Sequence, residues 1–381
     1  MAPPSARRPR GTDTLAELAR FFLWLGAVGF GGPVVHLALL EEHAVRMRRW
    51  LTADEFLELL GLTNLIPGPN STEMAMAIGY RRAGFAGLLV AGVCFILPAA
   101  CLTTLLAWMY VRYAALPWLQ PALAGLAPAV IVVMAHGAFR LGRDAVRSAL
   151  DVATMLVVCA LALYGISEMA LLGGAAVVGA LQPLRTRTLV MTGVVLAGVP
   201  LVAASVQAPA SLQSLGGYFL EVGAVLYGGG YVLVAFLQGL VDHQGWLTQR
   251  QLFDAVAAGQ VTPGPVLTTA TFVGYLVLGP LGAVVATAAI FLPAFVFTAV
   301  LGPLTPWLRR SGVVRRAVRL VSVASVAIIV AVTLTLAGKV VTGPAALIPV
   351  IASIVAAVSG AGSAGVLIAG IFASVLSAAL R

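Results

Sequence analysis

The stretch LGAVGFGGP at residues 25–33 recurs as VGAVLYGGG at residues 222–230, and the similarity continues along the chain. The further matches are Trp50-Leu51-Thr52 with Trp246-Leu247-Thr248, Glu58 with Asp254, Pro67-Gly68-Pro69 with Pro263-Gly264-Pro265, Gly79-Tyr80 with Gly274-Tyr275, and Leu97-Pro98-Ala99 with Leu292-Pro293-Ala294. The offset between matching positions changes only from 197 residues at Gly26 to 195 residues at Gly79. The chain therefore contains an internal repeat whose helix-breaking residues fall at the same places in both copies.

The composition is that of a polytopic membrane protein. Hydrophobic residues make up 60% of the 381 residues and charged residues only 10%, whereas soluble proteins carry about 25% charged residues. We interpret the net charge of +9 as the excess of lysine and arginine in cytoplasmic loops, so the expected partner is a lipid bilayer and not a nucleic acid. The three cysteines lie inside apolar runs without pairing or metal-binding spacing and are interpreted as core residues: Cys94, Cys101 and Cys159.

The repeat divides the chain into four parts. We expect a cytoplasmic disordered tail at 1–15, a first transmembrane repeat at 16–185, a connecting transmembrane segment and loop at 186–215, and a second repeat at 216–381. Thirteen apolar segments follow the tail, and seven of them precede the second repeat. An odd number predicts that the two copies face opposite ways in the membrane. The expected fold is all-α, with two inverted-topology repeats, in the cytoplasmic (inner) membrane.

The sequence leaves two possible paths through the membrane for the first two apolar segments. Arg46, Arg48 and Arg49 would lie outside the cell if the segment at 16–40 simply crossed the membrane. They would lie inside if the segments at 16–40 and 53–80 each dip into the membrane and return. We favour broken or re-entrant helices, but both paths keep the remaining loops on the same sides.

Glycine and proline clusters predict helix breaks at four equivalent places. In a helix interior glycine costs about 1 kcal/mol and proline about 3 kcal/mol relative to alanine. Freed backbone groups inside a membrane are tolerated only where they face protein or a water-filled cavity. The four breaks therefore predict a substrate site, lined by Gly31, Gly32, Pro33, Gly228, Gly229, Gly230, Pro67, Gly68, Pro69, Pro263, Gly264 and Pro265.

Each Pro-Gly-Pro motif is followed by residues typical of an anion site. A half-helix that starts there presents free N–H groups and a partial positive charge. Asn70, Ser71 and Thr72 stand on its first turn in the first copy, and Thr268 and Thr269 in the second, where Thr268 aligns with Thr72. Alternatively, Asn70 is only an N-cap and completes a capping box with Glu73.

Ionisable residues inside apolar segments are candidates for coupling, because a charge in the membrane is costly. His36 follows the first break and can carry a proton near neutral pH. We consider His36, and one of Glu73, Glu58 or Asp254, as the proton-coupling groups. Arg81 and Arg82 either attract an anion to the entrance or anchor their helix end at the lipid headgroups.

The motifs quoted above resemble those of the chromate ion transporter family, in its long, two-domain members. The similarity rests on residues 30–36, Trp50-Leu51, 67–80, 227–230 and 262–269. It implies efflux of chromate from the cytoplasm by secondary transport, driven by the proton gradient as in an antiporter that confers chromate resistance. Sulfate is then expected as a structural analogue of the substrate.

Other functions remain as alternatives. Uptake of sulfate or another oxyanion would use the same architecture, and a passive anion channel could use the same half-helix site. An intramembrane enzyme is disfavoured because no His-Glu-x-x-His metal motif is present, and a nucleotide-binding loop is also missing. We therefore expect no metal and no cofactor. The sequence does not decide whether the protein forms a homodimer.

Overall fold

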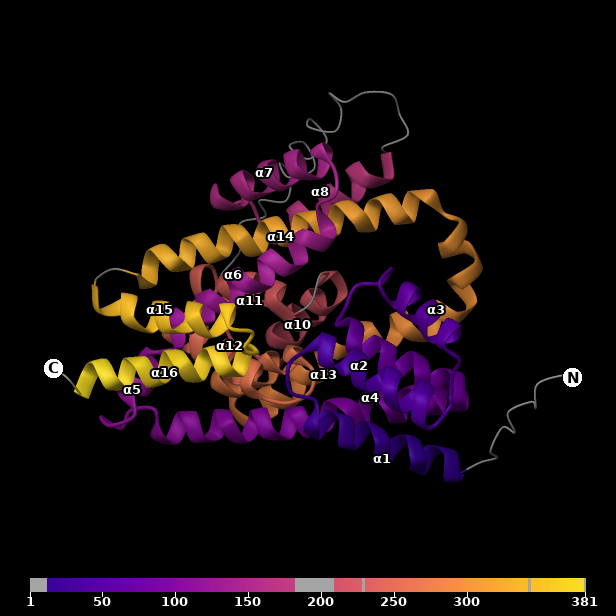
Figure 1. Ribbon diagram of the computed structural model, residues 1–381, viewed down its shortest axis with the longest axis horizontal. Coiled ribbons are helices and arrows are strands. Elements are labelled where there is room, and N and C mark those ends of the chain that lie inside the picture. Colours follow the sequence, from indigo (N-terminus) through magenta and orange to yellow (C-terminus); the bar gives the residue numbers. More distant parts are fainter. Residues whose placement is uncertain (1–11, 182–208, 228–229, 342–343, 380–381) are drawn as a thin grey trace, which may run out of the picture.

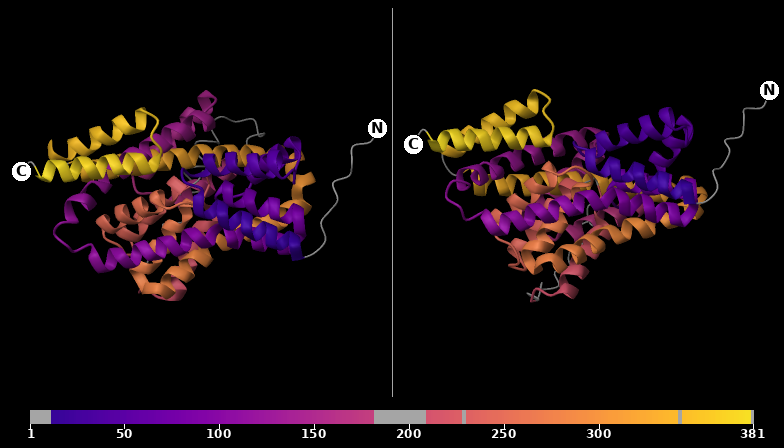
Figure 2. Two further views of the ribbon diagram at one scale, coloured as in Figure 1. Left: turned by 60° about the horizontal axis from the view of Figure 1, so that its bottom comes forward. Right: turned by 90° about the horizontal axis from the view of Figure 1, so that it is seen from below.

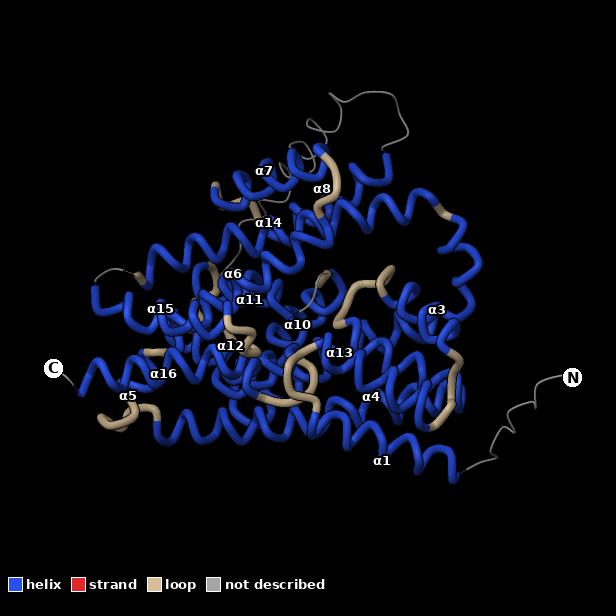
Figure 3. The backbone as a smooth tube through the Cα atoms, viewed as in Figure 1, coloured by secondary structure: helices blue, strands red, loops and turns tan. Residues whose placement is uncertain are grey.

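The computed structural model describes residues 12–181, 209–227, 230–341 and 344–379. Within these ranges all regular secondary structure is helical and no strand is present; loops join the helices (Figure 3). The molecule is elongated, and the long helices run along its length in all three views (Figures 1 and 2). Several predictions lie outside the described residues: Gly228, Gly229, most of the tail at 1–15, and most of the connecting stretch at 186–215.

The elements of the two copies follow the same order. The first copy contains α1 (Thr12–Val28), α2 (Pro33–Leu40), η1 (Glu41–Met47), α3 (Ala53–Thr63), α4 (Asn70–Tyr113), α5 (Gln120–Ala124), α6 (Leu126–Ala145), α7 (Ala149–Leu163) and α8 (Glu168–Leu181). The second copy contains α10 (Leu212–Val225), α11 (Gly230–Asp242), α12 (Gln249–Val261), η2 (Val266–Thr268), α13 (Thr269–Arg310), α14 (Gly312–Val340), α15 (Pro344–Val358) and α16 (Ser363–Ala379).

The helices break at the predicted glycine and proline positions. Gly31 and Gly32 have positive φ angles of 110° and 75°, a conformation that side-chain-bearing residues rarely adopt, and α2 begins directly after them. Gly68 (φ 135°) and Gly264 (φ 87°) play the same part within the two Pro-Gly-Pro motifs. A new helical segment follows each motif, α4 in the first copy and η2 leading into α13 in the second.

The helices α4 and α13 each double back on themselves. Ala83 and Gly84 leave helical geometry in α4, as do Leu278 and Gly279 in α13. After the turn in α4, Gly87 packs so closely on Gly79 that a Cβ on either would overlap the other's carbonyl oxygen. In a straight helix these residues would be about 12 Å apart. Each helix therefore has a short part, 70–82 or 269–277, and a long part, 85–113 or 280–310.

In the first copy, both broken segments return to the end of the molecule where they begin. Glu17, near the start of α1, lies 3.5 Å from Arg48, which follows η1, and 3.6 Å from Arg82 at the end of the short part of α4. Glu55, in the first turn of α3, pairs with Arg81 at 2.9 Å. The elements between 12 and 82 thus form two helical hairpins that open at one end of the molecule.

The hairpins of the second copy open at the opposite end. Near the start of α12, Asp254 accepts a hydrogen bond of 2.7 Å from Tyr110 in the last turn of α4. The helix between Arg82 and Tyr110 is about 40 Å long at 1.5 Å per residue. The equivalent helices α3 and α12 therefore begin at opposite ends of this long helix, each with a capping box, at Thr52 and at Thr248.

Four helical stretches of the described residues are long and apolar enough to cross a membrane: Asn70–Tyr113, Gln120–Ala145, Val266–Leu301 and Gly312–Val340. These four are fewer than the thirteen apolar segments of the sequence, because several of those segments are halves of hairpins or shorter helices and the one at 189–207 lies outside the described residues. The two copies also exchange their terminal helices. α7 and α8 pack on α14 of the second copy, whereas α15 and α16 pack on α6 of the first.

Candidate functional site

The breaks from both copies contact each other. The backbone N–H of Gly68 donates to the carbonyl oxygen of Leu226 at 2.9 Å, and that of Gly264 donates to the carbonyl oxygen of Gly29 at 3.0 Å. Gly29 and Leu226 are equivalent in the repeat, and so are Gly68 and Gly264. Each Pro-Gly-Pro turn is thus held by the break of the other copy. We call residues 67–73 the first tip and residues 263–269 the second tip.

The first tip has three polar atoms without a partner. The N–H groups of Thr72 and Glu73 both donate to the carbonyl oxygen of Pro69, at 2.7 and 3.3 Å. The Thr72 hydroxyl and both carboxyl oxygens of Glu73 are buried, and they have no hydrogen-bond partner in the described part of the chain. The side chain of Glu73 lies directly against Gly68, where a Cβ would overlap it. The site's free hydrogen-bonding groups are therefore side chains rather than these two amides.

Asn70 does not form the predicted alternative capping box. The N-cap of α4 is Pro69, and Asn70 turns back toward α3. Its side-chain oxygen accepts a hydrogen bond of 2.7 Å from Thr63, and its amide nitrogen donates to Asn64 at 2.7 Å. Asn64 is exposed and Asn70 half-buried, so a polar connection leads from the surface to the turn that bears Glu73.

His36 ties the first glycine break to the start of α4. Its fully buried ring places Nε2 2.7 Å from the carbonyl oxygen of Gly29 and Nδ1 3.3 Å from the hydroxyl of Ser71. Because a carbonyl oxygen can only accept, Nε2 carries a proton, and a neutral ring then accepts from Ser71 at Nδ1. The edge of the ring meets Phe95 with centroids 5.2 Å apart.

The second tip satisfies its own hydroxyl groups. Thr268 donates to the carbonyl oxygen of Pro265 at 2.9 Å and accepts from Thr103 of α4 at 3.4 Å. Thr269 donates to the carbonyl oxygen of Val266 at 2.8 Å. Gly230, at the start of α11, packs against Val266. The second tip therefore has the same backbone as the first but a closed set of side-chain hydrogen bonds.

The remaining predicted residues lie away from the tips. Asp254 is buried beside Tyr110, and Glu58 stands at the equivalent place on α3, each at least one helical turn before its break. Arg81 and Arg82 are in ion pairs at the open end of the first hairpins. The backbone hydrogen bond from Thr52 lowers the pKa of Glu55, so this partner of Arg81 stays ionised.

Three residues outside the tips were not among the site residues predicted from the sequence. Tyr227, in the break between α10 and α11, donates to the carbonyl oxygen of Asn64 at 3.1 Å. Thr103 contacts the second tip, and its equivalent Thr298 is buried on α13 without a hydrogen-bond partner among the described residues. The equivalence of these threonines could have been found by extending the match at Leu97-Pro98-Ala99 by four residues.

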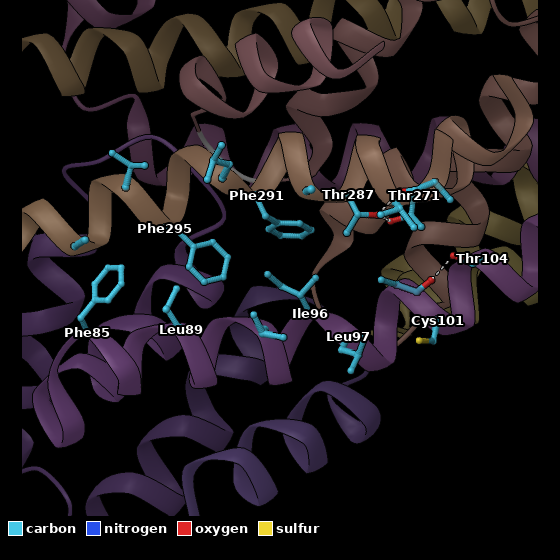
Figure 4. Close-up of a pocket in the computed structure, with 18 of the residues that line it drawn as sticks. Phe85, Leu89, Ile96, Leu97, Cys101, Thr104, Thr271, Thr287, Phe291 and Phe295 are labelled. Atoms are coloured by element: carbon cyan, nitrogen blue, oxygen red, sulfur yellow. Dashed lines mark hydrogen bonds between the residues drawn. The ribbon is translucent and has the colours of Figure 1, made fainter. Parts of the chain in front are cut away.

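A large apolar groove on the molecule is unsuited to an oxyanion. It measures about 920 Å³ and lies between the long parts of α4 and α13, lined by side chains such as Leu89, Ile96, Phe291 and Phe295 (Figure 4). Its hydroxyl groups are already used: Thr271 and Thr287 lie 2.7 Å apart, and Thr104 donates to a carbonyl oxygen of its own helix. A dianion there would have almost no polar partners, which makes the groove a surface for apolar molecules.

The architecture is that of a membrane transport protein built from two copies of one helical unit. The family model described as "Chromate transporter" matches residues 16–180 and 213–377, and the chain belongs to this family as a long member with two copies. It is 37% identical over 304 residues to the "Chromate transport protein" of Cupriavidus metallidurans, covering 77% of this chain and 75% of that protein.

Two further relatives have similar names. The "Probable chromate transport protein" of Synechococcus elongatus is 34% identical over 306 residues, with 76% of each chain covered. The "Chromate transport protein" of Pseudomonas aeruginosa is 32% identical over 299 residues, covering 74% of this chain and 71% of that protein. No solved structure gave a significant match.

Proposed function

We propose that this protein is a secondary active transporter that exports chromate across the cytoplasmic membrane, with the proton as coupling ion. The observation that carries the proposal is the meeting of the two tips, where Gly68 and Gly264 each bond to a break of the other copy. Names of relatives that are about one-third identical support chromate as the substrate. The oxyanion would bind between the tips, at the middle of the molecule.

Alternating access follows from the opposite directions of the hairpins. α3 and α12 begin at opposite ends of the long helix of α4. We take the two copies as inverted repeats, whose re-entrant hairpins enter from opposite faces of the membrane and bring their tips together at the midplane. Movement of one hairpin pair would open the site to one side while the other pair closes it.

The chemistry of the tips favours a tetrahedral oxyanion. Hydroxyl groups and the positive ends of two half-helices can bind oxygen atoms without burying a full positive charge. Such a site recognises the shape and charge of an oxyanion and not the identity of its central atom. Sulfate, also a tetrahedral dianion, is therefore expected to compete with chromate, and uptake of sulfate is the alternative function.

The test is uptake of labelled chromate into liposomes that contain the purified protein, with and without a pH gradient. Saturable, gradient-dependent uptake that sulfate inhibits supports the proposal. Non-saturating flux that ignores the gradient would indicate a channel, and sulfate flux without chromate flux would overturn the substrate.

A matched pair of variants tests the role of the tips. Gly264→Ala adds a Cβ 2.9 Å from that of Ala99 at the second tip, whereas Gly245→Ala adds one in open space. Both glycines have positive φ angles, 87° and 65°, so both variants carry backbone strain. We expect at least a tenfold loss of transport for Gly264→Ala only. Equal rates in the two variants would contradict a site between the tips.

A further inference from the structure

The two tips differ in their side chains although their backbones are equivalent. In the second tip, Thr103 donates to Thr268, and Thr268 and Thr269 donate to carbonyl oxygens of their own turn. The equivalents at the first tip are Thr72 and Glu73 within it, and Thr298 on α13 in the place of Thr103. Their exposed fractions are 2%, 0% and 0%, and none of their side-chain oxygens has a partner among the described residues.

Such a group of orphaned atoms is unusual for a folded protein. More than nine in ten buried polar groups have a hydrogen-bond partner, because leaving one unpaired costs about 1–3 kcal/mol. The second tip shows that this backbone can satisfy its side chains internally. Polar side chains without partners at only one of two equivalent places therefore indicate a ligand at that place.

The three side chains belong to one locus. The carboxyl group of Glu73 lies against Gly68, and Gly68 faces the methyl group of Ala294 on α13. Thr298 lies one helical turn beyond Ala294, on the same face of α13. Its equivalent, Thr103, reaches the hydroxyl of the equivalent tip threonine at 3.4 Å. By this equivalence we infer that the hydroxyls of Thr72 and Thr298 flank the region next to Glu73.

The structure assigns the oxyanion to the first tip, where we propose that the hydroxyls of Thr72 and Thr298 and the protonated carboxyl of Glu73 donate to its oxygens. This assignment rests on the proposed function. Two titratable groups accompany Glu73 at the first tip: Tyr227, with which it interacts electrostatically, and His36, which is engaged by Gly29 and Ser71. Neither supplies the positive charge that would hold an ionised carboxylate next to a dianion.

Binding of a proton by Glu73 is therefore expected to favour binding of the anion. An ionised Glu73 would repel a dianion, whereas the protonated carboxyl offers an O–H donor. Wherever Glu73 is ionised in the free protein, one proton is therefore taken up with each anion bound.

Chromate binding to the purified, detergent-solubilised full-length protein tests the assignment by calorimetry in buffers of different ionisation enthalpy. Measured at a pH high enough to ionise Glu73 in the free protein, the wild type is expected to take up about one proton per anion, and to bind more tightly as the pH falls. Glu73→Gln keeps a neutral donor, so it should bind without proton uptake and without this pH dependence. Proton uptake by Glu73→Gln equal to that of the wild type would overturn the role of Glu73.

The threonines are tested as an equivalent pair. Thr298→Val should weaken binding about tenfold, the loss of roughly one hydrogen bond to a charged group. Thr103→Val should change affinity less than twofold, because its hydroxyl is already used within the second tip, and Thr333→Val on α14 serves as a distant control. Equal losses for Thr298→Val and Thr103→Val would refute the asymmetry. If the wild type neither binds nor moves chromate or sulfate, the proposed function itself fails.

Discussion

At the scale of single residues, His36 connects elements that the sequence separates. Its ring bridges the carbonyl oxygen of Gly29, which also accepts from Gly264, and the hydroxyl of Ser71. The equivalent residue in the second copy is Leu233. The first copy thus carries both the histidine and the carboxyl group at the tips.

His36→Leu should lower the thermal stability of the detergent-solubilised protein. The substitution leaves the Ser71 hydroxyl buried without its partner, at a cost of about 1–3 kcal/mol. The unfolding midpoint measured by circular dichroism or differential scanning fluorimetry checks this. His136→Leu, on an exposed part of α6, is the control and should change the midpoint little. Equal shifts in the two variants would show that the bridge contributes nothing.

At the scale of elements, the tight turns of α4 and α13 depend on glycine at the helix contact. The backbone of Gly79 approaches that of Gly87, and Gly274 approaches Gly282 in the same way. No side chain fits between helices at this distance. The short part of each helix is consequently held against its long part, which fixes the position of the tip.

Gly79→Ala should destabilise the protein by about 1–3 kcal/mol, because the new methyl group overlaps a backbone carbonyl that cannot move aside. Gly61→Ala on α3 is the matched control, since nothing lies within 4 Å of its Cβ. It should be neutral or stabilising by up to about 1 kcal/mol through helix propensity. The unfolding midpoints of both variants test this prediction. A Gly79→Ala protein as stable as the wild type would be inconsistent with the observed helix contact.

The sequence predicted the breaks at this scale but not their contacts. Glycine and proline disfavour helix locally, so the interruptions at Gly31–Pro33 and Pro67–Pro69 follow from the residues themselves. That Gly68 bonds to Leu226 depends on packing between segments far apart in the chain, which no local pattern contains. The lack of a hydrogen-bond partner for Thr298 among the described residues also depends on tertiary packing. Its equivalent Thr103 is the same residue type and does have a partner.

At the scale of the whole molecule, the orientation of the two copies is open to a direct measurement. After replacement of Cys94, Cys101 and Cys159, single cysteines are introduced by Asp54→Cys at the start of α3 or His243→Cys before α12, both at exposed positions. A membrane-impermeant maleimide should label the first from the cytoplasmic side and the second from the outer side. Labelling of both from one side would exclude inverted copies.

The paired hydrogen bonds between the tips also bear on the ancestry of the chain. A polypeptide with a single copy could not close its own tip, because the acceptor for its Pro-Gly-Pro glycine belongs to the other copy. Each copy needs a neighbour of opposite orientation to complete its tip. A chain that carries both copies can hold different side chains at the two tips, as Glu73 and its equivalent Thr269 do.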